Sequence, residues 1–153
     1  LVCAAQATAL AQSRPGVAYE AGHDAAVATL TEGLLSLGLL KGRLETAIER
    51  GDYKRFYRHK TGHWLGLDVH DVGEYRIDGE SRLLEPGMVF TLEPGLYIPS
   101  DDASVPAKWR GIGIRIEDDV LVTPEGNDII TIATPKTIAE IEALMREDPH
   151  AKA

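Results

Sequence analysis

The spacing of apolar residues predicts helices in the first third of the chain. Residues 1–12 are rich in alanine and precede a Ser-Arg-Pro-Gly sequence that ends helices. In residues 19–37 the larger apolar side chains recur at intervals of three or four, which is the period of one helix face. These side chains are Val27, Leu30, Leu34 and Leu37. A shorter helix is expected over residues 43–50, because Gly51 follows it.

From His59 onward the apolar period becomes shorter, and in two later segments apolar and polar residues alternate, which is typical of strands. In one such segment Glu93 shares a face with Thr91, and in another Glu117 shares a face with Arg115, opposite three isoleucines. Alternation therefore predicts that both glutamates project from the polar faces of otherwise hydrophobic strands.

The last part of the chain predicts a hairpin and a fourth helix. Residues 119–122 and 128–132 have strand-like composition and flank a Pro- and Gly-containing turn at 123–127. A short helix is expected over residues 138–145, and residues 146–153 form a polar tail. The predicted class is thus α+β.

Charge and composition narrow the range of partners. The net charge of −8, with no basic stripe, argues against nucleic acid or an anionic membrane as the main partner. No apolar run reaches the roughly 18 residues of a membrane span. Cys3 is the single cysteine, which rules out an internal disulfide and fits a cytoplasmic location. The 153 residues suffice for one domain with a sizeable core.

Three histidines and two glutamates are the candidate functional residues. They are His59, His63, His70, Glu93 and Glu117. A carboxylate in apolar surroundings is costly unless a cation or hydrogen-bond donors compensate its charge. An oxygen-rich site with one imidazole suits divalent Mn, Co or Zn. A cation held there would polarise a carbonyl and activate water, as in metal-assisted amide hydrolysis.

Other interpretations of the histidines are weaker. His59 and His63 are four residues apart, as in the HExxH zinc motif, but Lys60 stands where that motif has glutamate and Gly62 lies within the spacing. His23, on a predicted amphipathic helix, is expected to be a hydrogen-bonded structural residue.

The aspartates near these motifs are assigned structural roles. Asp68 and Asp71 are expected to cap turns or support the ligands rather than bind metal. Asp118 and Asp119 are expected to be solvated or to form a turn. A pairing of Glu117 with Arg115, two residues away on one strand, is the structural alternative to a metal-binding role.

Three motifs together carry a family resemblance. His63-Trp-Leu-Gly-Leu-Asp-Val-His-Asp-Val-Gly73, Glu93-Pro-Gly-Leu-Tyr97 and Arg115-Ile-Glu-Asp118 resemble the "pita-bread" metallopeptidases of the methionine aminopeptidase and prolidase superfamily. The similarity is greatest to Xaa-Pro aminopeptidases (aminopeptidase P) and extends over residues 1–143. It implies that residues 1–145 are the C-terminal part of a catalytic domain with a curved antiparallel sheet covered by helices.

The resemblance also implies roles for individual residues. His63, Glu93 and Glu117 match metal ligands, and Glu117 matches the ligand that bridges two metal ions. Glu93 also matches the carboxylate that handles the proton of the attacking nucleophile. His59 and His70 match histidines that contact substrate and stabilise the transition state, and Arg115 matches a residue beside the bridging glutamate. The implied cofactor is a pair of divalent ions, Mn first, with Co or Zn as alternatives.

One departure from the family pattern concerns the remaining ligands. The family's other two ligands are aspartates on upstream strands, in Asp-x-Gly and Asp-x-Thr-Arg sequences that this chain lacks. We therefore expect the chain to be a fragment of a longer polypeptide and to be inactive alone. A sheet edge left open by the missing strands predicts association, as a homo-oligomer or with the lost segment.

The activity implied by the resemblance is removal of the N-terminal residue from peptides with proline in second position. Two alternatives stay open. One is a prolidase that cleaves Xaa-Pro dipeptides. The other is a non-catalytic pita-bread module that binds peptides or proteins, although the retention of His59, His63, His70, Glu93 and Glu117 argues against it.

Overall fold

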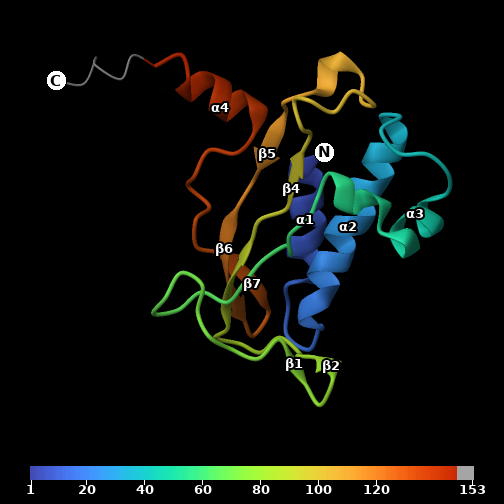
Figure 1. The fold of residues 1–153 in the computed structure, drawn as a ribbon. Helices are drawn as coiled ribbons and strands as arrows, with labels where there is room; N and C mark the ends of the chain where they lie inside the picture. Colours follow the sequence, from blue (N-terminus) through green and yellow to red (C-terminus); the bar gives the residue numbers. More distant parts are fainter. Residues whose placement is uncertain (148–153) are drawn as a thin grey trace.

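The computed structural model describes residues 1–147 and begins with two helices that lie side by side (Figure 1). These are α1 (Val2–Gln12) and α2 (Tyr19–Ser36). Ala5 and Ala9 on α1 and Ala26 on α2 are fully buried, so small side chains line the helix pair and allow close approach. Both helices match their predicted ranges to within one residue at each end.

The end of α2 explains why Leu37, the last of the apolar residues at helical spacing, is exposed. Gly38 adopts a left-handed conformation with φ of 72°, and its amide donates to the carbonyl of Leu35. The amide of Leu39 donates to the carbonyl of Leu34, which completes a Schellman motif. Leu37 lies outside the helix as its C-cap and is 42% exposed, whereas Leu34 is fully buried.

The remaining elements are short. After α3 (Leu44–Arg50), Gly51 turns the chain with φ of 70° into the 3₁₀ helix η1. The strands form three small antiparallel sheets, with the orders β1-β2, β3-β6-β7 and β4-β5. The elements that follow α3 are η1 (Asp52–Arg55), β1 (Arg76–Ile77), β2 (Glu80–Ser81), β3 (Val89–Leu92), β4 (Gly95–Tyr97), η2 (Ala107–Trp109), β5 (Gly113–Arg115), β6 (Asp118–Thr123), β7 (Gly126–Ile129) and α4 (Ile138–Leu144).

Two of these sheets share one register. Leu92 of β3 pairs with Asp118 of β6, and Gly95 of β4 pairs with Arg115 of β5. When either register is continued into the gap between the two sheets, Glu93 lies opposite Glu117. The chain segments 89–97 and 113–123 therefore run antiparallel as one long ribbon with a short interruption.

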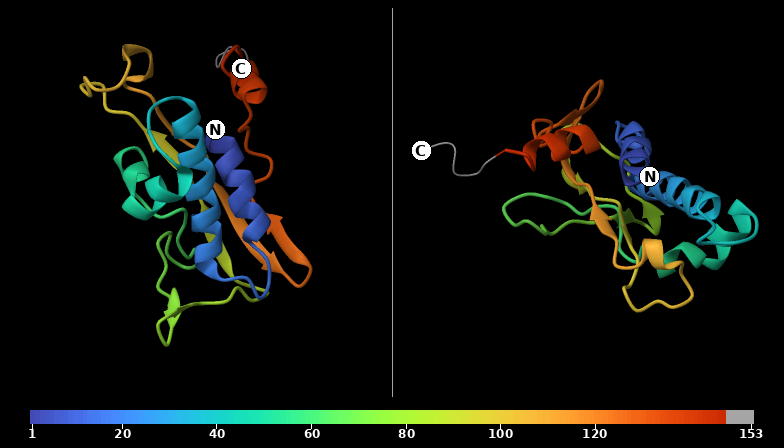
Figure 2. Two further views of the ribbon diagram at one scale, coloured as in Figure 1. Left: turned by 90° about the vertical axis from the view of Figure 1, so that its right-hand side faces the viewer. Right: turned by 90° about the horizontal axis from the view of Figure 1, so that it is seen from above.

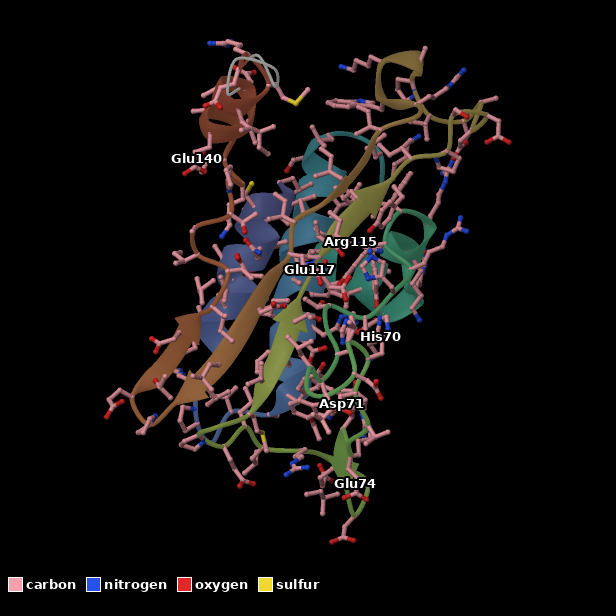
Figure 3. All side chains as sticks on the ribbon, turned by 90° about the vertical axis from the view of Figure 1, so that its left-hand side faces the viewer. His70, Asp71, Glu74, Arg115, Glu117 and Glu140 are labelled. Carbon is pink, nitrogen blue, oxygen red and sulfur yellow. The ribbon has the colours of Figure 1, made fainter. Side chains whose placement is uncertain are left out.

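The helices cover one face of this ribbon and leave the other free. Phe90, Leu92, Val120 and Val122 are almost fully buried in the core with the helices. Figure 2, left, shows α1 and α2 in front of the strands, and Figure 3 shows the opposite, helix-free side. Ile114, predicted to lie on a hydrophobic strand face, is 47% exposed, whereas Leu96, its partner on β4, is buried in the core.

The C-terminal predictions differ from the structure in detail. The hairpin is tighter than expected, since Thr123 pairs with Gly126 and two residues form the turn. The fourth helix begins as predicted, with Thr137 and Glu140 forming a capping box at its start. Most of the predicted polar tail, residues 148–153, lies outside the described residues. Between residues 1 and 147, no helix is both long and apolar enough to cross a membrane.

Candidate metal centre

Three neighbouring strand segments bring the predicted ligands together. Residues 61–65 run antiparallel to β3 on its free edge: the Thr91 amide donates to the His63 carbonyl at 2.9 Å, and the Glu93 amide donates to the Thr61 carbonyl at 2.6 Å. Segment 113–123 lies on the other edge of the same strand. One ligand atom each from His63, Glu93 and Glu117 lies within 4.8 Å of the others.

The hydrogen bonding of His63 leaves one ring nitrogen free for a metal. Its Nδ1 lies 2.9 Å from the carbonyl oxygen of Trp64, which only accepts, so Nδ1 carries the proton of the neutral ring. Nε2 then presents a lone pair and lies 3.4 Å from the Glu93 carboxylate. A second hydrogen bond that fixes the tautomer is typical of metal-binding histidines.

The carboxylates of Glu93 and Glu117 lie close to each other in the ligand cluster. Partial burial, followed by the neighbouring Glu93, raises the pKa of Glu117. Glu93 is largely enclosed, with 12% of its side chain exposed, and accepts a long hydrogen bond of 3.4 Å from Thr91. An imidazole and two opposed carboxylates are the donor set that a divalent cation stabilises.

Glu117 is more exposed than its sequence context suggested. It is one of the exposed residues of the chain, whereas a costly burial was predicted for both glutamates. The difference arises because the side chain lies on the helix-free face, in front of the ribbon in Figure 3.

Arg115 contacts the opposite glutamate rather than its neighbour along the strand. Its Nε lies 3.5 Å from Glu93 and donates to the Tyr97 hydroxyl at 2.8 Å. Gly95, the residue paired with Arg115, has no side chain to block this path, and a Cβ there would lie 2.5 Å from the Tyr97 hydroxyl oxygen. The ion pair that the structure shows is therefore not the Arg115–Glu117 pair that was the structural alternative.

His59 joins the site through Tyr97. Its Nδ1 lies 2.7 Å from the carbonyl oxygen of Lys60, so Nδ1 carries the proton of the neutral ring. Its Nε2 then accepts from the Tyr97 hydroxyl at 2.9 Å, and that hydroxyl accepts from Arg115. Arg115 thus donates to Tyr97, and Tyr97 donates to His59, in one chain of hydrogen bonds.

His70 lies beside the ligands on a projecting loop. Its ring is tilted against that of His63, with 4.2 Å between the centroids. The residue is exposed, and Figure 3 shows it on the same side of the ribbon as Arg115 and Glu117. All six predicted site residues therefore belong to one connected set.

Tyr97 was missed as a site residue by the sequence reasoning. A signal was present, because Glu93, Gly95 and Tyr97 alternate and so share one strand face. The missing information was that Gly95 leaves room for Arg115 and Tyr97 to meet.

Asp118 is the clearest error among the predicted structural residues. It was expected to be solvated, but only 1% of it is exposed, and it accepts hydrogen bonds from Gln6 at 2.9 Å and from Thr131 at 2.7 Å. Lys136 pairs with it at 2.7 Å. Because strand residues alternate, Asp118 points towards the helices while Glu117 points away from them.

A cavity of about 550 Å³ lies next to this centre, since residues 60–62, between His59 and His63, help to line it. The rest of its lining comes from the end of α1, the start of α2, the start of β1, and β3, and includes Tyr19, His23 and Leu92. None of the six predicted site residues lines it. The metal-ligand geometry, rather than this cavity, therefore marks the candidate centre.

His23 is a partly buried residue that lines this cavity, and it makes a testable contribution to stability. Its Nδ1 lies 2.8 Å from the Thr61 hydroxyl, and burial, with Lys60 as a smaller cause, lowers its pKa. The unfolded chain therefore takes up the proton first as pH falls through about 6.5, so stability is present above that pH and declines below it. We expect His23→Gln to flatten this decline in unfolding free energy measured between about pH 5 and 7. An unchanged slope would contradict the prediction.

Comparison with known proteins defines the class. The sequence model of metallopeptidase family M24 matches residues 1–124, and the chain belongs to that family. It is 52% identical to the Xaa-Pro aminopeptidase of Haemophilus influenzae over 145 residues, which are 95% of this chain and 33% of that protein. It is 50% identical to the Xaa-Pro aminopeptidase of Escherichia coli, over 90% of this chain and 31% of that protein.

Solved structures confirm the predicted fold. Aminopeptidase PepP of Pseudomonas aeruginosa matches with a TM-score of 0.92 and 54% identity, over 94% of this chain and 33% of that one. Aminopeptidase P of E. coli with the inhibitor Pro-Leu matches with a TM-score of 0.88 and 49% identity, over 94% of this chain and 32% of that one. The fold is the α+β pita-bread fold, and the chain spans about a third of the length of these relatives.

Proposed function

We propose that this chain is the C-terminal part of the catalytic domain of a metal-dependent Xaa-Pro aminopeptidase. The observation that carries the proposal is the convergence of His63, Glu93 and Glu117, with one ligand atom of each within 4.8 Å of the others. The names of the relatives support the substrate class, because both curated proteins described above are Xaa-Pro aminopeptidases. The complete protein would release the N-terminal residue from peptides whose second residue is proline.

His63, Glu93 and Glu117 would hold divalent metal in the complete protein. Mn is proposed first, and Zn or Co as alternatives, since the oxygen-rich donor set accommodates all three. A Zn-substituted E. coli aminopeptidase P is among the similar structures, with a TM-score of 0.88. Bound metal supplies Lewis-acid polarisation of a scissile carbonyl. Two aspartates from outside this chain are proposed to complete the ligand set.

The remaining residues have proposed roles in positioning and proton transfer. The Glu93 carboxylate is aimed at the ligand cluster and is the group suited to take and return a proton. His70, exposed beside His63, is available to donate to a developing oxyanion. Arg115 and Tyr97 fix the orientation of Glu93 and His59. Because the Tyr97 hydroxyl occupies Nε2 of His59, we propose that His59 contacts substrate either after its ring rotates away from Tyr97 or through the edge of the ring.

The two alternative functions, a prolidase and a peptide-binding module, would use the same fold but act differently on peptides. A prolidase would act on Xaa-Pro dipeptides at the same ligands, and a peptide-binding module would not cleave at all. We favour the aminopeptidase because the curated relatives above carry that name. The net charge of −8 fits peptide substrates better than nucleic acid or membrane lipid, and we propose a cytoplasmic location. A homo-oligomer, predicted from the sheet edge that the missing upstream strands would leave open, is a further proposal.

Metal stoichiometry and peptide cleavage in the complete protein test the function together. The protein is loaded with Mn²⁺, freed of unbound ions, and assayed with an Xaa-Pro-Xaa tripeptide and an Xaa-Pro dipeptide. Bound metal with cleavage of the tripeptide supports the aminopeptidase. Cleavage of the dipeptide alone supports the prolidase. Metal binding without cleavage of either, or no metal binding, contradicts the proposed activity.

Removing the Tyr97 hydroxyl tests its role in orienting the site. Tyr97→Phe leaves the Arg115 and His59 nitrogens without their shared partner. We expect kcat/KM for the tripeptide to fall roughly thirtyfold, since the two lost hydrogen bonds contribute about 1 kcal/mol each. Tyr53→Phe on η1 is the matched control and should keep its activity. An unchanged kcat/KM in Tyr97→Phe would show that the hydroxyl does not orient these groups.

A further inference from the structure

A buried carboxylate lies directly behind the candidate metal centre. Asp118 follows Glu117 in the chain, and its side chain occupies the helix-covered face of the ribbon. Gln6 donates to its Oδ2, and Thr131 and Lys136 both contact its Oδ1 at 2.7 Å. These four residues form the Asp118 cluster.

The donors of this cluster come from two distant parts of the chain. Gln6 lies on α1, whereas Thr131 and Lys136 lie in the coil between β7 and α4, which runs back beside β6 in Figure 1. The Thr131 hydroxyl donates to Asp118 and accepts from the amide of Asp119 at 3.0 Å. The Ile130 amide donates to the Asp119 carbonyl at 2.8 Å. The coil is therefore fixed to the first two residues of β6.

The backbone at Glu117 depends on such anchoring because regular pairing is interrupted there. Arg115 ends β5 and Asp118 begins β6, so Glu117 lies between two paired segments. On the opposite strand Glu93 is followed by Pro94, which has no amide to donate. The Pro94 carbonyl accepts from the Ile116 amide at 3.3 Å, which is a long contact.

We propose that the Asp118 cluster positions Glu117 opposite Glu93 and thereby sets the metal affinity of the centre. The inference rests on the proposed metal-dependent function. Asp118 is a positioning residue, since its carboxylate faces away from the metal ligands. Lys136, 19% of whose side chain is exposed, neutralises the buried charge, so the cluster adds no uncompensated negative charge behind two glutamates.

Thr131→Val in the complete protein is the first test. Valine keeps the shape of threonine but removes the hydroxyl that joins Asp118 to the Asp119 amide. Mn²⁺ titration calorimetry should give an affinity roughly tenfold weaker, the scale seen when groups supporting a metal ligand are lost. Thr131→Ser, which retains the hydroxyl, should bind Mn²⁺ as the wild type does. Thr123→Val, at the far end of β6, is the matched control and should also bind normally.

Lys136→Met supplies an independent variant at the more exposed side of the cluster, with Lys41→Met in the α2-α3 loop as its control. Thermal midpoints of all metal-free variants are recorded as well. A weaker Mn²⁺ affinity in Thr131→Val and Lys136→Met, measured below their midpoints, supports positioning. Lowered midpoints with wild-type Mn²⁺ affinity show a purely structural cluster and overturn the inference. If the wild type binds no Mn²⁺, the proposed metal centre fails, and the inference fails with it.

Discussion

Glu93→Gln in the complete protein is expected to lower kcat/KM for an Xaa-Pro tripeptide by about 10²–10⁴-fold while leaving the protein folded. Glutamine keeps the size of the side chain but loses the negative charge and the ability to take a proton. Glu93 is proposed both to bind metal and to transfer a proton, so one substitution removes two contributions. The loss corresponds to about 3–5 kcal/mol of transition-state stabilisation.

The same substitution should have little effect on folding. Glu93 lies opposite Glu117, and the negative charge of Glu93 contributes to the raised pKa of Glu117. Its ion pair with Arg115 spans 3.5 Å, and 48% of the arginine side chain is exposed, so the pair stabilises weakly. We expect the free energy of unfolding of the metal-free protein to change by less than about 1 kcal/mol.

Activity at saturating Mn²⁺ separates the two roles of Glu93. Glu125→Gln, in the exposed turn between β6 and β7, is the matched control and should retain full activity. If Glu93→Gln binds metal as the wild type does and still loses activity, proton transfer is its larger role. Wild-type kcat/KM in Glu93→Gln would remove Glu93 from the mechanism.

Local periodicity predicted the parts of the structure that depend on local sequence. The three-to-four spacing of Leu30 and Leu34 placed α2, and its glycine cap ended it within one residue of the expected position. Period-two alternation placed Glu93 on the same face as Thr91, and the Thr91 hydroxyl donates to the Glu93 carboxylate at 3.4 Å. The strand segment that carries Glu93 could therefore be identified without knowledge of the fold.

Features that depend on distant contacts could not be predicted in this way. Asp118 is buried because Gln6, 112 residues earlier in the chain, and Lys136 satisfy its carboxylate. Nothing in the Ile-Glu-Asp-Asp sequence marks one aspartate for burial and the next for partial exposure. Likewise, residues 61–65 carried a motif without strand periodicity, and they pair with β3 only because the tertiary fold brings them there.

Gly62→Ala is expected to destabilise the protein by about 3 kcal/mol or more and to abolish Mn²⁺ binding. A Cβ at residue 62 would lie 1.8 Å from the carbonyl oxygen of Thr91, which is a backbone atom and cannot rotate away. To relieve the clash, residues 61–65 must move off β3. That movement breaks the hydrogen bonds from Glu93 to Thr61 and from Thr91 to His63, each contributing about 1 kcal/mol.

Gly126→Ala is the matched control, because nothing lies within 4 Å of a Cβ added there and its φ is not positive. This control should change the free energy of unfolding by less than about 0.5 kcal/mol. Denaturant unfolding and Mn²⁺ titration of both variants complete the test. Since Gly62 lies next to His63 in the chain, the two losses should occur together: the close approach that stabilises the ribbon edge also carries the imidazole to the two glutamates. Gly62→Ala with wild-type stability would show that the strand pairing tolerates a side chain at this contact.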